Sequence, residues 1–408
     1  MTTVKTMETE DKYAVPFFNK IPISIERGEG VYVWDEEGNR FMDFTSGWGV
    51  TCLGHAHPVI TDALQAQGKK IIQNPNSGLT YSPVRAALLM LISQILPSNL
   101  TRVFFSNSGA EANDAAIKLA RKVTGRLDVI STVQSFHGRT ISTASATGQA
   151  KHRQKFNPLM PNYRFIPFNN IKSLRESLDT DVAAVIMEPI QGEGGVQIPS
   201  EGYLEQVSRL CKANGSLLII DEIQTGFCRC GTMFAISPLK VEADFLTMAK
   251  GIAGGFPFGA FAMTEDVAAK VEVGDHGGTY CGNPLGCAVS YAVIKHLVDN
   301  NICANAAEIG SLALSRMNEW KQTYPEIIID IRGKGLLLAV EFINEEAATC
   351  ISDECLAKGL FIRQTQGNMI RIFPALNIKR EEMEEGLSIL REAIEGFIGL
   401  KVKRRGKQ

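Results

Sequence analysis

Between about residues 60 and 300, short apolar runs alternate with longer stretches of helical composition, and this pattern constrains the fold more than any other feature. The apolar runs have the length and β-branched content of buried strands. Strands separated by helices indicate a largely parallel sheet covered on both faces. We therefore predict an α/β fold with strands at six positions: Val103–Ser106, Asp128–Thr132, Ala183–Glu188, Ser216–Ile220, Phe245–Met248 and Gly259–Met263.

Both ends of the chain depart from this alternation. Residues 31–44 have the pattern of a β-hairpin, because two β-rich runs flank a turn of Asp, Glu, Gly and Asn. After an amphipathic stretch at Cys281–Asn300, two runs are typical of strands and one of a helix: Gly333–Phe342, Met369–Ile372 and Arg380–Ile398. We predict a smaller α+β domain made from both ends, dividing the chain into 1–58 (N-terminal part of the small domain), 59–305 (large domain) and 306–408 (C-terminal small domain).

Composition excludes several classes of protein. The chain has 408 residues, 45% of them hydrophobic and 21% charged, as in ordinary globular proteins. A net charge of −2 creates no field that would gather nucleic acid or a membrane surface. The basic tail 401–407 is expected to be a solvated end. The N-terminus has no apolar signal region, and no stretch approaches the length of a membrane span. We expect neither a nucleic acid nor a membrane as partner.

The sequence shows no pattern typical of a disulfide framework, a metal site or a nucleotide site. The nine cysteines form no repeating framework, and reduced thiols in a cytoplasmic protein are the simplest interpretation. The six histidines do not cluster with acidic or cysteine partners at the spacing of a metal site. No G-x-G-x-x-G follows an early strand and no Walker lysine is present, which disfavours nucleotide binding.

Two charged residues at predicted strand ends suggest a cofactor. Asp221 directly follows a run of apolar β residues, and Lys250 lies between an apolar run and a glycine-rich loop. An acid buried at a strand end requires a cationic partner. Pyridoxal 5′-phosphate (PLP) enzymes need a lysine that holds the aldehyde as a Schiff base and a carboxylate that keeps the ring nitrogen protonated. Lys250 alone could equally be a surface lysine, but the pair favours a PLP site.

Three further motifs fit this hypothesis without requiring it. Ser108 and Gly109 open a predicted helix whose free N–H groups could hold a phosphate, although an ordinary capped helix gives the same pattern. Phe136 could stack on a ring and Arg139 could bind a carboxylate, although such residues are commonly core and surface residues respectively. Glu193 lies in a glycine-rich loop that could be plain turn chemistry.

With these residues in place, the chain resembles the class III aminotransferases of PLP fold type I over nearly its whole length. The likeness is greatest to the acetylornithine and ornithine branch. Such enzymes have a large domain with a mostly parallel seven-stranded sheet between helices. The matching segments are 53–58, 107–113, 135–140, 188–195, 221–226, 249–260, 278–285 and 371–378.

The resemblance also implies roles for individual residues. Lys250 would carry PLP and transfer the proton, Asp221 would pair with the pyridine nitrogen, and Gln224 would approach the phenolic oxygen. Phe136 would stack on the ring. The phosphate would be held by Ser108, Gly109 and Ala110, together with Thr279 from the partner subunit of a homodimer.

For the substrates, the resemblance implies that Arg139 binds a carboxylate. Glu193 would mask Arg371 while the amine donor is bound and would then release it for 2-oxoglutarate. The expected reaction moves the terminal amino group of an N-acetylornithine-like donor to 2-oxoglutarate.

Trp48 departs from the branch, where this position usually carries a small aliphatic residue or a tyrosine. It could line the substrate entrance or simply pack under the N-terminal segment. Cys228 and Cys230 stand where relatives often have glycine and threonine, and we interpret them as packing changes. Donors such as ornithine, 4-aminobutyrate or a specialised amine stay open. An aminomutase of the same fold would not need Arg139, Glu193 and Arg371 together. A PLP-binding protein that has lost its activity would not need the whole set of Lys250, Asp221, Arg139, Glu193 and Thr279.

Overall fold

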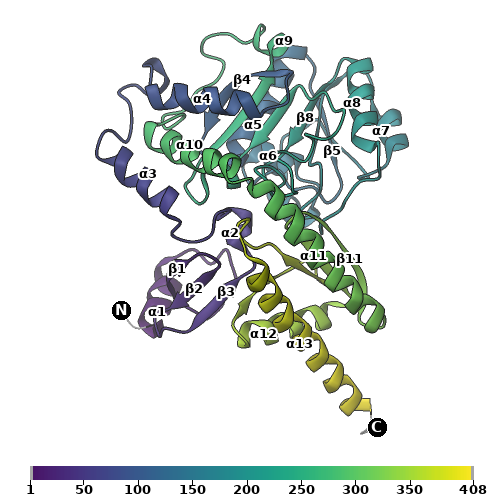
Figure 1. The fold of residues 1–408 in the computed structure, drawn as a ribbon. Coiled ribbons are helices and arrows are strands. Elements are labelled where there is room, and N and C mark those ends of the chain that lie inside the picture. Colours follow the sequence, from purple (N-terminus) through teal and green to yellow (C-terminus); the bar gives the residue numbers. More distant parts are fainter. Residues whose placement is uncertain (1–2, 406–408) are drawn as a thin grey trace.

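A seven-stranded sheet forms the centre of the protein, in a computed structural model that describes residues 3–405 (Figure 1). Strand β10 is antiparallel to both of its neighbours, and the other paired strands are parallel. The α/β prediction with a mostly parallel sheet is confirmed. In order across the sheet, the strands are β4 (Leu100–Ser106), β10 (Gly259–Thr264), β9 (Phe245–Met248), β8 (Leu217–Asp221), β7 (Val182–Met187), β5 (Asp128–Thr132) and β6 (Tyr163–Ile166).

Alternate residues of these strands face two separate cores. In β8, Leu218 and Ile220 belong to the larger core, whereas Ile219 belongs to a smaller core on the opposite face. Successive side chains of a strand point to opposite faces, so a strand buried on both faces is apolar throughout. This explains why the predicted strands were continuous apolar runs. The prediction missed β6, an edge strand with partly exposed side chains.

Helices cover both faces of the sheet (Figure 1). Helix α5 packs on β7, β8, β9 and β10 through a stripe of alanines in the smaller core. It begins after Ser108, whose side chain accepts from the Glu111 N–H at 3.2 Å, and it ends at Gly125 in the left-handed conformation. The helices of this part are α3 (Pro58–Gly68), α4 (Pro83–Ile95), α5 (Gly109–Thr124), α6 (Ile141–Ala146), α7 (Ile171–Ser177), α8 (Tyr203–Asn214), α9 (Glu265–Ala268) and α10 (Pro284–Asp299).

Two smaller sheets lie beside the large one, and the first joins the two ends of the chain. Its order is β1 (Ile25–Glu29), β2 (Tyr32–Asp35), β3 (Arg40–Asp43) and β13 (Leu360–Phe361), with β13 parallel to β3. The predicted hairpin at 31–44 is β2 and β3. The second sheet has the order β11 (Ile328–Lys334), β12 (Leu337–Phe342), β15 (Met369–Ile372) and β14 (Arg363–Thr365). The helices here are α1 (Thr3–Tyr13), α2 (Ser46–Gly49), α11 (Ile302–Thr323), α12 (Glu345–Ala357) and α13 (Arg380–Arg405).

Some sequence expectations were wrong in this part. The predicted strand Gly333–Phe342 is divided by a turn, because Gly335 adopts a left-handed φ of +57° and the chain reverses between β11 and β12. Helix α11 was not predicted. The side chains of 400–408, including the basic tail, lie outside the described residues. Within 3–405, no helix is long and apolar enough to cross a membrane.

The interpretation of all nine cysteines as reduced thiols was also wrong. Cys228 forms a disulfide with Cys303, 75 residues later in the chain. Folding brings the loop after β8 against the first turn of α11, so that their Cα atoms lie 4.4 Å apart. Cys228 is therefore a covalent link and more than a packing change, whereas Cys230 is a buried free thiol.

Candidate active site

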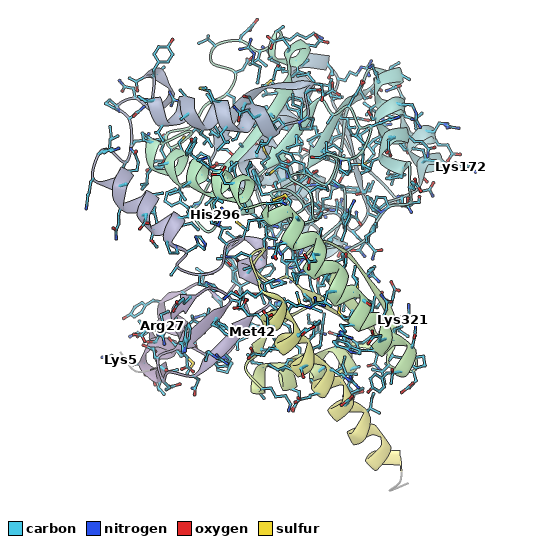
Figure 2. All side chains as sticks on the ribbon, in the orientation of Figure 1. Lys5, Arg27, Met42, Lys172, His296 and Lys321 are labelled. Atoms are coloured by element: carbon cyan, nitrogen blue, oxygen red, sulfur yellow. A yellow bond between two sulfur atoms is a disulfide. The ribbon has the colours of Figure 1, made fainter. Side chains whose placement is uncertain are left out.

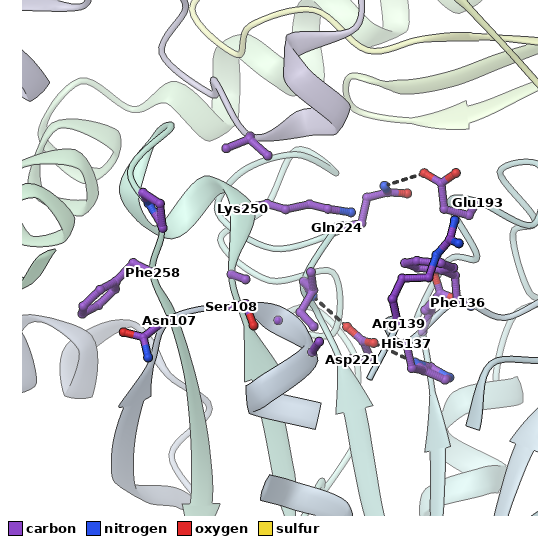
Figure 3. A pocket seen from close by; sticks show the side chains of 18 of the residues that line it. Asn107, Ser108, Phe136, His137, Arg139, Glu193, Asp221, Gln224, Lys250 and Phe258 are labelled. Atoms are coloured by element: carbon purple, nitrogen blue, oxygen red, sulfur yellow. Dashed lines mark hydrogen bonds and ion pairs between the residues drawn. The ribbon is translucent and has the colours of Figure 1, made fainter. Parts of the chain in front are cut away.

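A cavity of about 440 Å³ lies at the end of the large sheet where the parallel strands finish (Figure 3). This edge of an open α/β sheet is the usual place for a ligand, because loops from several strands converge there. The cavity is lined by most of the residues singled out in the sequence: Ser108, Gly109, Ala110, Phe136, Arg139, Glu193, Asp221, Gln224 and Lys250.

Lys250 follows β9 and begins the short 3₁₀ helix η4 (Lys250–Ala253). Its φ of +46° is left-handed, a conformation that costs energy for a residue with a side chain and that is found preferentially at functional sites. Figure 3 shows its amine directed across the cavity towards Gln224. Burial lowers the pKa of Lys250 from its usual 10.5, and the neighbouring Glu193 carboxylate opposes this only in part. The amine is therefore easier to deprotonate here than in water.

Asp221 ends β8 and is almost fully buried. Its Oδ2 lies 2.7 Å from His137 Nδ1 and accepts a hydrogen bond from Asn113 Nδ2, also at 2.7 Å. Its Oδ1 accepts from the backbone N–H of Ile223 at 3.0 Å. Asn113 in turn accepts from the Thr247 hydroxyl at 2.7 Å. The network holds the carboxylate in one orientation at the floor of the cavity.

The N-terminus of α5 faces the cavity through Ser108, Gly109 and Ala110. The first N–H groups of a helix have no partner within the helix, and the helix dipole adds positive potential there. Gly109 leaves room that a side chain would close, since a Cβ at this position would lie 2.7 Å from the Ile223 side chain. The geometry suits a phosphate group.

Phe136 and Arg139 stand on the loop after β5. The Arg139 guanidinium lies 5.5 Å from the centroid of the half-buried Phe136 ring, close enough for a cation–π contact. Arg139 is exposed and lines the cavity, as Figure 3 shows. A flat aromatic face and a guanidinium are therefore available to a bound molecule.

Glu193 and Arg371 form an ion pair, with 2.6 Å between Oε1 and Nη1. Arg371 lies on the inner strand β15 and is 2% exposed. The Glu193 Oε1 also accepts from Gln224 Nε2 at 3.2 Å. Burial would raise the pKa of Glu193, but Arg371 and Lys250 outweigh it and lower this pKa to about 2. The carboxyl is therefore ionised at any physiological pH.

The backbone around Glu193 is held on several sides. Its carbonyl accepts from Gln366 Nε2 at 2.5 Å, and Gln366 belongs to the turn between β14 and β15. Gln191 donates to the carbonyl of Val133 at 2.9 Å and bridges to Gln197. Any displacement of the Glu193 carboxylate from Arg371 is therefore confined to rotation of the side chain.

Three predicted site residues lie outside the lining of this cavity: Arg371, which contacts the lining residue Glu193, together with Thr279 and Trp48. Thr279 is exposed, and its carbonyl accepts from the Gln73 side chain at 2.7 Å. Trp48 is 46% exposed, and the Arg363 guanidinium lies 5.7 Å from its ring centroid. Val50, two residues further along the chain, lines the cavity, whereas Trp48 is not among its lining residues.

Comparisons with known proteins identify the family. The family model described as "Aminotransferase class-III" matches residues 15–394. The chain belongs to the class III aminotransferases. It is 42% identical to the acetylornithine aminotransferase of Methanothermobacter thermautotrophicus, over 97% of this chain and 99% of that protein.

Solved structures of class III aminotransferases match the fold closely. The acetylornithine aminotransferase of Elizabethkingia anophelis has a TM-score of 0.86 and 31% identity, covering 97% of this chain and 100% of that chain. The ornithine aminotransferase of Toxoplasma gondii has a TM-score of 0.92 and 30% identity, covering 100% and 96%. The Toxoplasma structure is described as having partial occupancy of PLP at the active site. PLP is the cofactor of class III aminotransferases.

The residues of this cavity fit PLP. A lysine amine, a buried carboxylate and a helix N-terminus match the aldehyde, the ring nitrogen and the phosphate of the cofactor. Among the described residues, the buried Gln224 Oε1 has no hydrogen-bond partner, although the residue lines the cavity. A polar group of a bound molecule would satisfy it.

Sequence reasoning gave no role to several residues that shape the site. His137 and Asn113 lie within segments already singled out, yet their contacts with Asp221 depend on folding across 84 and 108 residues. Glu188 was predicted only as the last residue of a strand, and it also lines the cavity. Its position directly after the apolar run of β7 was the available signal.

Proposed function

We propose that this enzyme uses PLP to transfer the terminal amino group of N-acetylornithine, or a closely similar donor, to 2-oxoglutarate. The products are a semialdehyde and glutamate, formed by ping-pong kinetics. The observation that carries the proposal is the Glu193–Arg371 ion pair, whose Glu193 lines the same cavity as Lys250. Full-length identity of 42% to an acetylornithine aminotransferase supports this donor.

Most residues that would hold the cofactor converge on the cavity. Lys250 would bind the aldehyde, and Asp221, oriented by His137, would keep the ring nitrogen protonated. Phe136 would cover one face of the ring, and residues 108–110 would bind the phosphate. When bound, PLP supplies an electron sink that stabilises negative charge at the carbon bearing the amino group.

Lys250 would serve as general base and general acid once the donor amine has replaced it on the cofactor. Its lowered pKa makes the amine easier to deprotonate, and the neutral amine could accept a proton from the substrate carbon and return it at another atom. Asp221 cannot share this role, because its carboxylate is held by three hydrogen-bonding groups on the floor of the cavity.

Glu193 would select between the two substrates. While it pairs with Arg371, the site presents no free cation at that end and accepts the amine-bearing arm of the donor. Rotation of the Glu193 side chain would expose Arg371 to the second carboxylate of glutamate or 2-oxoglutarate. Arg139 would bind the carboxylate that both substrates share. Trp48, adjacent to the cavity, would contact the acyl end of the donor.

A homodimer would complete the site. Exposed apolar side chains gather in residues 71–81 and at Tyr280, and the two segments touch, since the Gln73 side chain donates to the carbonyl of Thr279, the residue before Tyr280, at 2.7 Å. Exposed apolar surface of this kind is typical of an interface. Thr279 stands beside it, where Thr279 of the partner subunit would reach the phosphate.

A cytoplasmic location is also proposed from the metabolic substrates; the Cys228–Cys303 disulfide does not support it, because such links are rare in that compartment.

A turnover assay tests the proposal. Purified enzyme with PLP and 2-oxoglutarate is given N²-acetylornithine, ornithine or 4-aminobutyrate, and glutamate formation is measured. We expect the highest kcat/KM with N²-acetylornithine and a loss on the order of 10⁴-fold or more in Lys250→Ala. A higher kcat/KM with ornithine would show that ornithine is the donor in place of N²-acetylornithine. Turnover that survives in Lys250→Ala would overturn the mechanism.

A further inference from the structure

Glu188 connects two parts of the candidate site that are far apart in the chain. It directly follows β7, is 4% exposed and lines the cavity. Its Oε2 accepts from the backbone N–H of Phe136 at 3.1 Å, and its Oε1 accepts from that of Gly192 at 3.2 Å. Each oxygen thus holds one segment: the loop that carries the Phe136 ring and the turn that carries Glu193.

The turn on the Gly192 side is tightly packed. A Cβ at Gly192 would overlap the Gln224 side chain, so this backbone lies directly against a residue that binds the Glu193 carboxylate. The Gly192 carbonyl accepts from the N–H groups of Gly195 and Val196 at 3.2 and 3.3 Å. The Gly192 N–H is therefore one end of a rigid turn, and the group that it binds sets where the Glu193 side chain begins.

Only a carboxylate of this length satisfies both donors. Glutamine offers one acceptor oxygen, and its NH₂ group would confront a backbone N–H. Aspartate keeps two acceptors on an arm that is one methylene shorter and cannot span both segments. Two buried backbone donors therefore depend on one side chain, and an unsatisfied buried donor is costly.

We propose that Glu188 is a positioning residue that couples the Phe136 loop to the Glu193 turn. It thereby sets how well the enzyme discriminates between its two amino donors, the N-acetylornithine-like substrate and glutamate. This proposal rests on the proposed function for the roles of Phe136 and Glu193. Loosening the Gly192 anchor weakens the placement of Glu193 on Arg371, which leaves Arg371 more available to glutamate and less well masked for the N-acetylornithine-like donor.

The charge environment is consistent with this role. Burial raises the pKa of Glu188 to about 7, and Asp221 adds to the shift, while His137 and the two backbone N–H groups oppose it. The two N–H donors thus favour the ionised carboxylate, which accepts from both at once.

Glu222 provides a matched control. It directly follows β8, is fully buried, and has a pKa that burial likewise raises to about 7. Its carboxylate accepts from the Thr225 hydroxyl and from the Ile236 N–H, the latter at 2.9 Å, and it does not line the cavity. Glu222→Gln therefore removes a comparable buried carboxylate without touching either coupled segment.

The experiment compares Glu188→Gln, Glu188→Asp and Glu222→Gln with the wild type. The first readout is the ratio of kcat/KM for N²-acetylornithine to kcat/KM for glutamate, each measured as a half-reaction. Since a misplacement of about 1 Å can cost about 100-fold in rate, we expect this ratio to fall on the order of 10-fold in both Glu188→Gln and Glu188→Asp, because neither side chain satisfies both backbone donors. In Glu222→Gln, stability falls and the ratio stays as in the wild type. A general loss of folding lowers both half-reactions equally and leaves the ratio unchanged.

The second readout is amide hydrogen exchange, followed with and without PLP, and it needs no substrate. We expect faster exchange in residues 133–139 and 189–196 together in the Glu188 variants and in neither segment in Glu222→Gln. An unchanged ratio in a folded Glu188 variant, or an equal change in Glu222→Gln, would overturn the proposal; should Glu188→Gln fail to fold, Glu188→Asp decides. If the wild type does not react with N²-acetylornithine, the proposed donor is wrong. The exchange result still tests whether Glu188 holds residues 133–139 and 189–196 together.

Discussion

Replacing Glu193 by glutamine removes one partner of a buried ion pair and leaves the other in place. The side chain of Arg371 is 3% exposed and that of Glu193 is 18% exposed. A glutamine would keep the shape and a hydrogen-bond acceptor but would not neutralise the guanidinium. Removing one partner of a buried pair typically costs 3–5 kcal/mol, because an uncompensated charge stays behind.

The pKa of Glu193 gives a second measure of the interaction. It lies at about 2, against an ordinary value of 4.5. At 1.36 kcal/mol per pKa unit, a lowering of roughly 2.5 units corresponds to about 3 kcal/mol of preference for the ionised form. Since about 1.4 kcal/mol is tenfold, this preference, to which Lys250 contributes beside Arg371, sets an upper limit of roughly 100-fold on the change in relative substrate binding.

We predict that Glu193→Gln raises kcat/KM for glutamate relative to N²-acetylornithine by roughly 10- to 100-fold, because Arg371 is no longer masked. The assay is rapid-mixing spectroscopy of each half-reaction on PLP-loaded enzyme. Glu265→Gln, which breaks the exposed pair with Arg102, serves as the control and should leave the ratio unchanged, since such surface pairs contribute little. An unaltered ratio in Glu193→Gln would refute the selection role.

Three further predictions concern Asp221, the pH dependence that Glu193 causes, and the disulfide. Asp221→Asn should retain PLP on Lys250 but lose on the order of 100-fold or more in kcat, since a neutral side chain no longer keeps the ring nitrogen protonated; full activity with PLP bound would contradict this. Because the folded pKa of Glu193 is depressed, its contribution to stability is complete above about pH 4.5 and is lost as the pH falls towards about 2, by roughly 3 kcal/mol. Urea unfolding of wild type and Glu193→Gln should therefore converge in acid, and a constant difference would count against the pair. Under oxidising conditions, Cys303→Ser should lower the free energy of unfolding by about 4 kcal/mol for a loop of this length, and equal stability with and without reductant would argue against the link to Cys228.

Local patterns were sufficient to predict the centre of the fold and the place of the candidate site. Asp221 and Lys250 each follow an apolar run, and adjacent parallel strands end at the same edge of a sheet, so both reach one cavity. The antiparallel direction of β10 leaves no signal in its own residues, because a strand buried on both faces looks the same in either direction. The assigned roles of both residues stay predictions.

Contacts between distant segments were not readable from the sequence. The Cys228–Cys303 link joins a loop to a helix that the sequence pattern did not reveal. In the sequence, Glu188 looks like any polar residue at the end of a strand. Only folding brings its two carboxylate oxygens against the N–H groups of Phe136 and Gly192. Trp48 illustrates the reverse case, since the likeness to relatives suggested the substrate entrance and the structure places it beside the cavity, 46% exposed.

The most direct test of PLP-dependent transamination is the absorption spectrum of the PLP-loaded enzyme before and after addition of N²-acetylornithine without any keto acid. We predict that the long-wavelength band of PLP bound to Lys250 is replaced by the shorter-wavelength band of pyridoxamine phosphate, and that 2-oxoglutarate restores it. A bound-PLP band that N²-acetylornithine leaves unchanged would contradict the proposed donor, and the absence of any such band would contradict the assignment of Lys250 as the cofactor lysine. The spread of side chains over the molecule in Figure 2 places Lys172 and Lys321 on outer helices, so neither competes with Lys250 for this site.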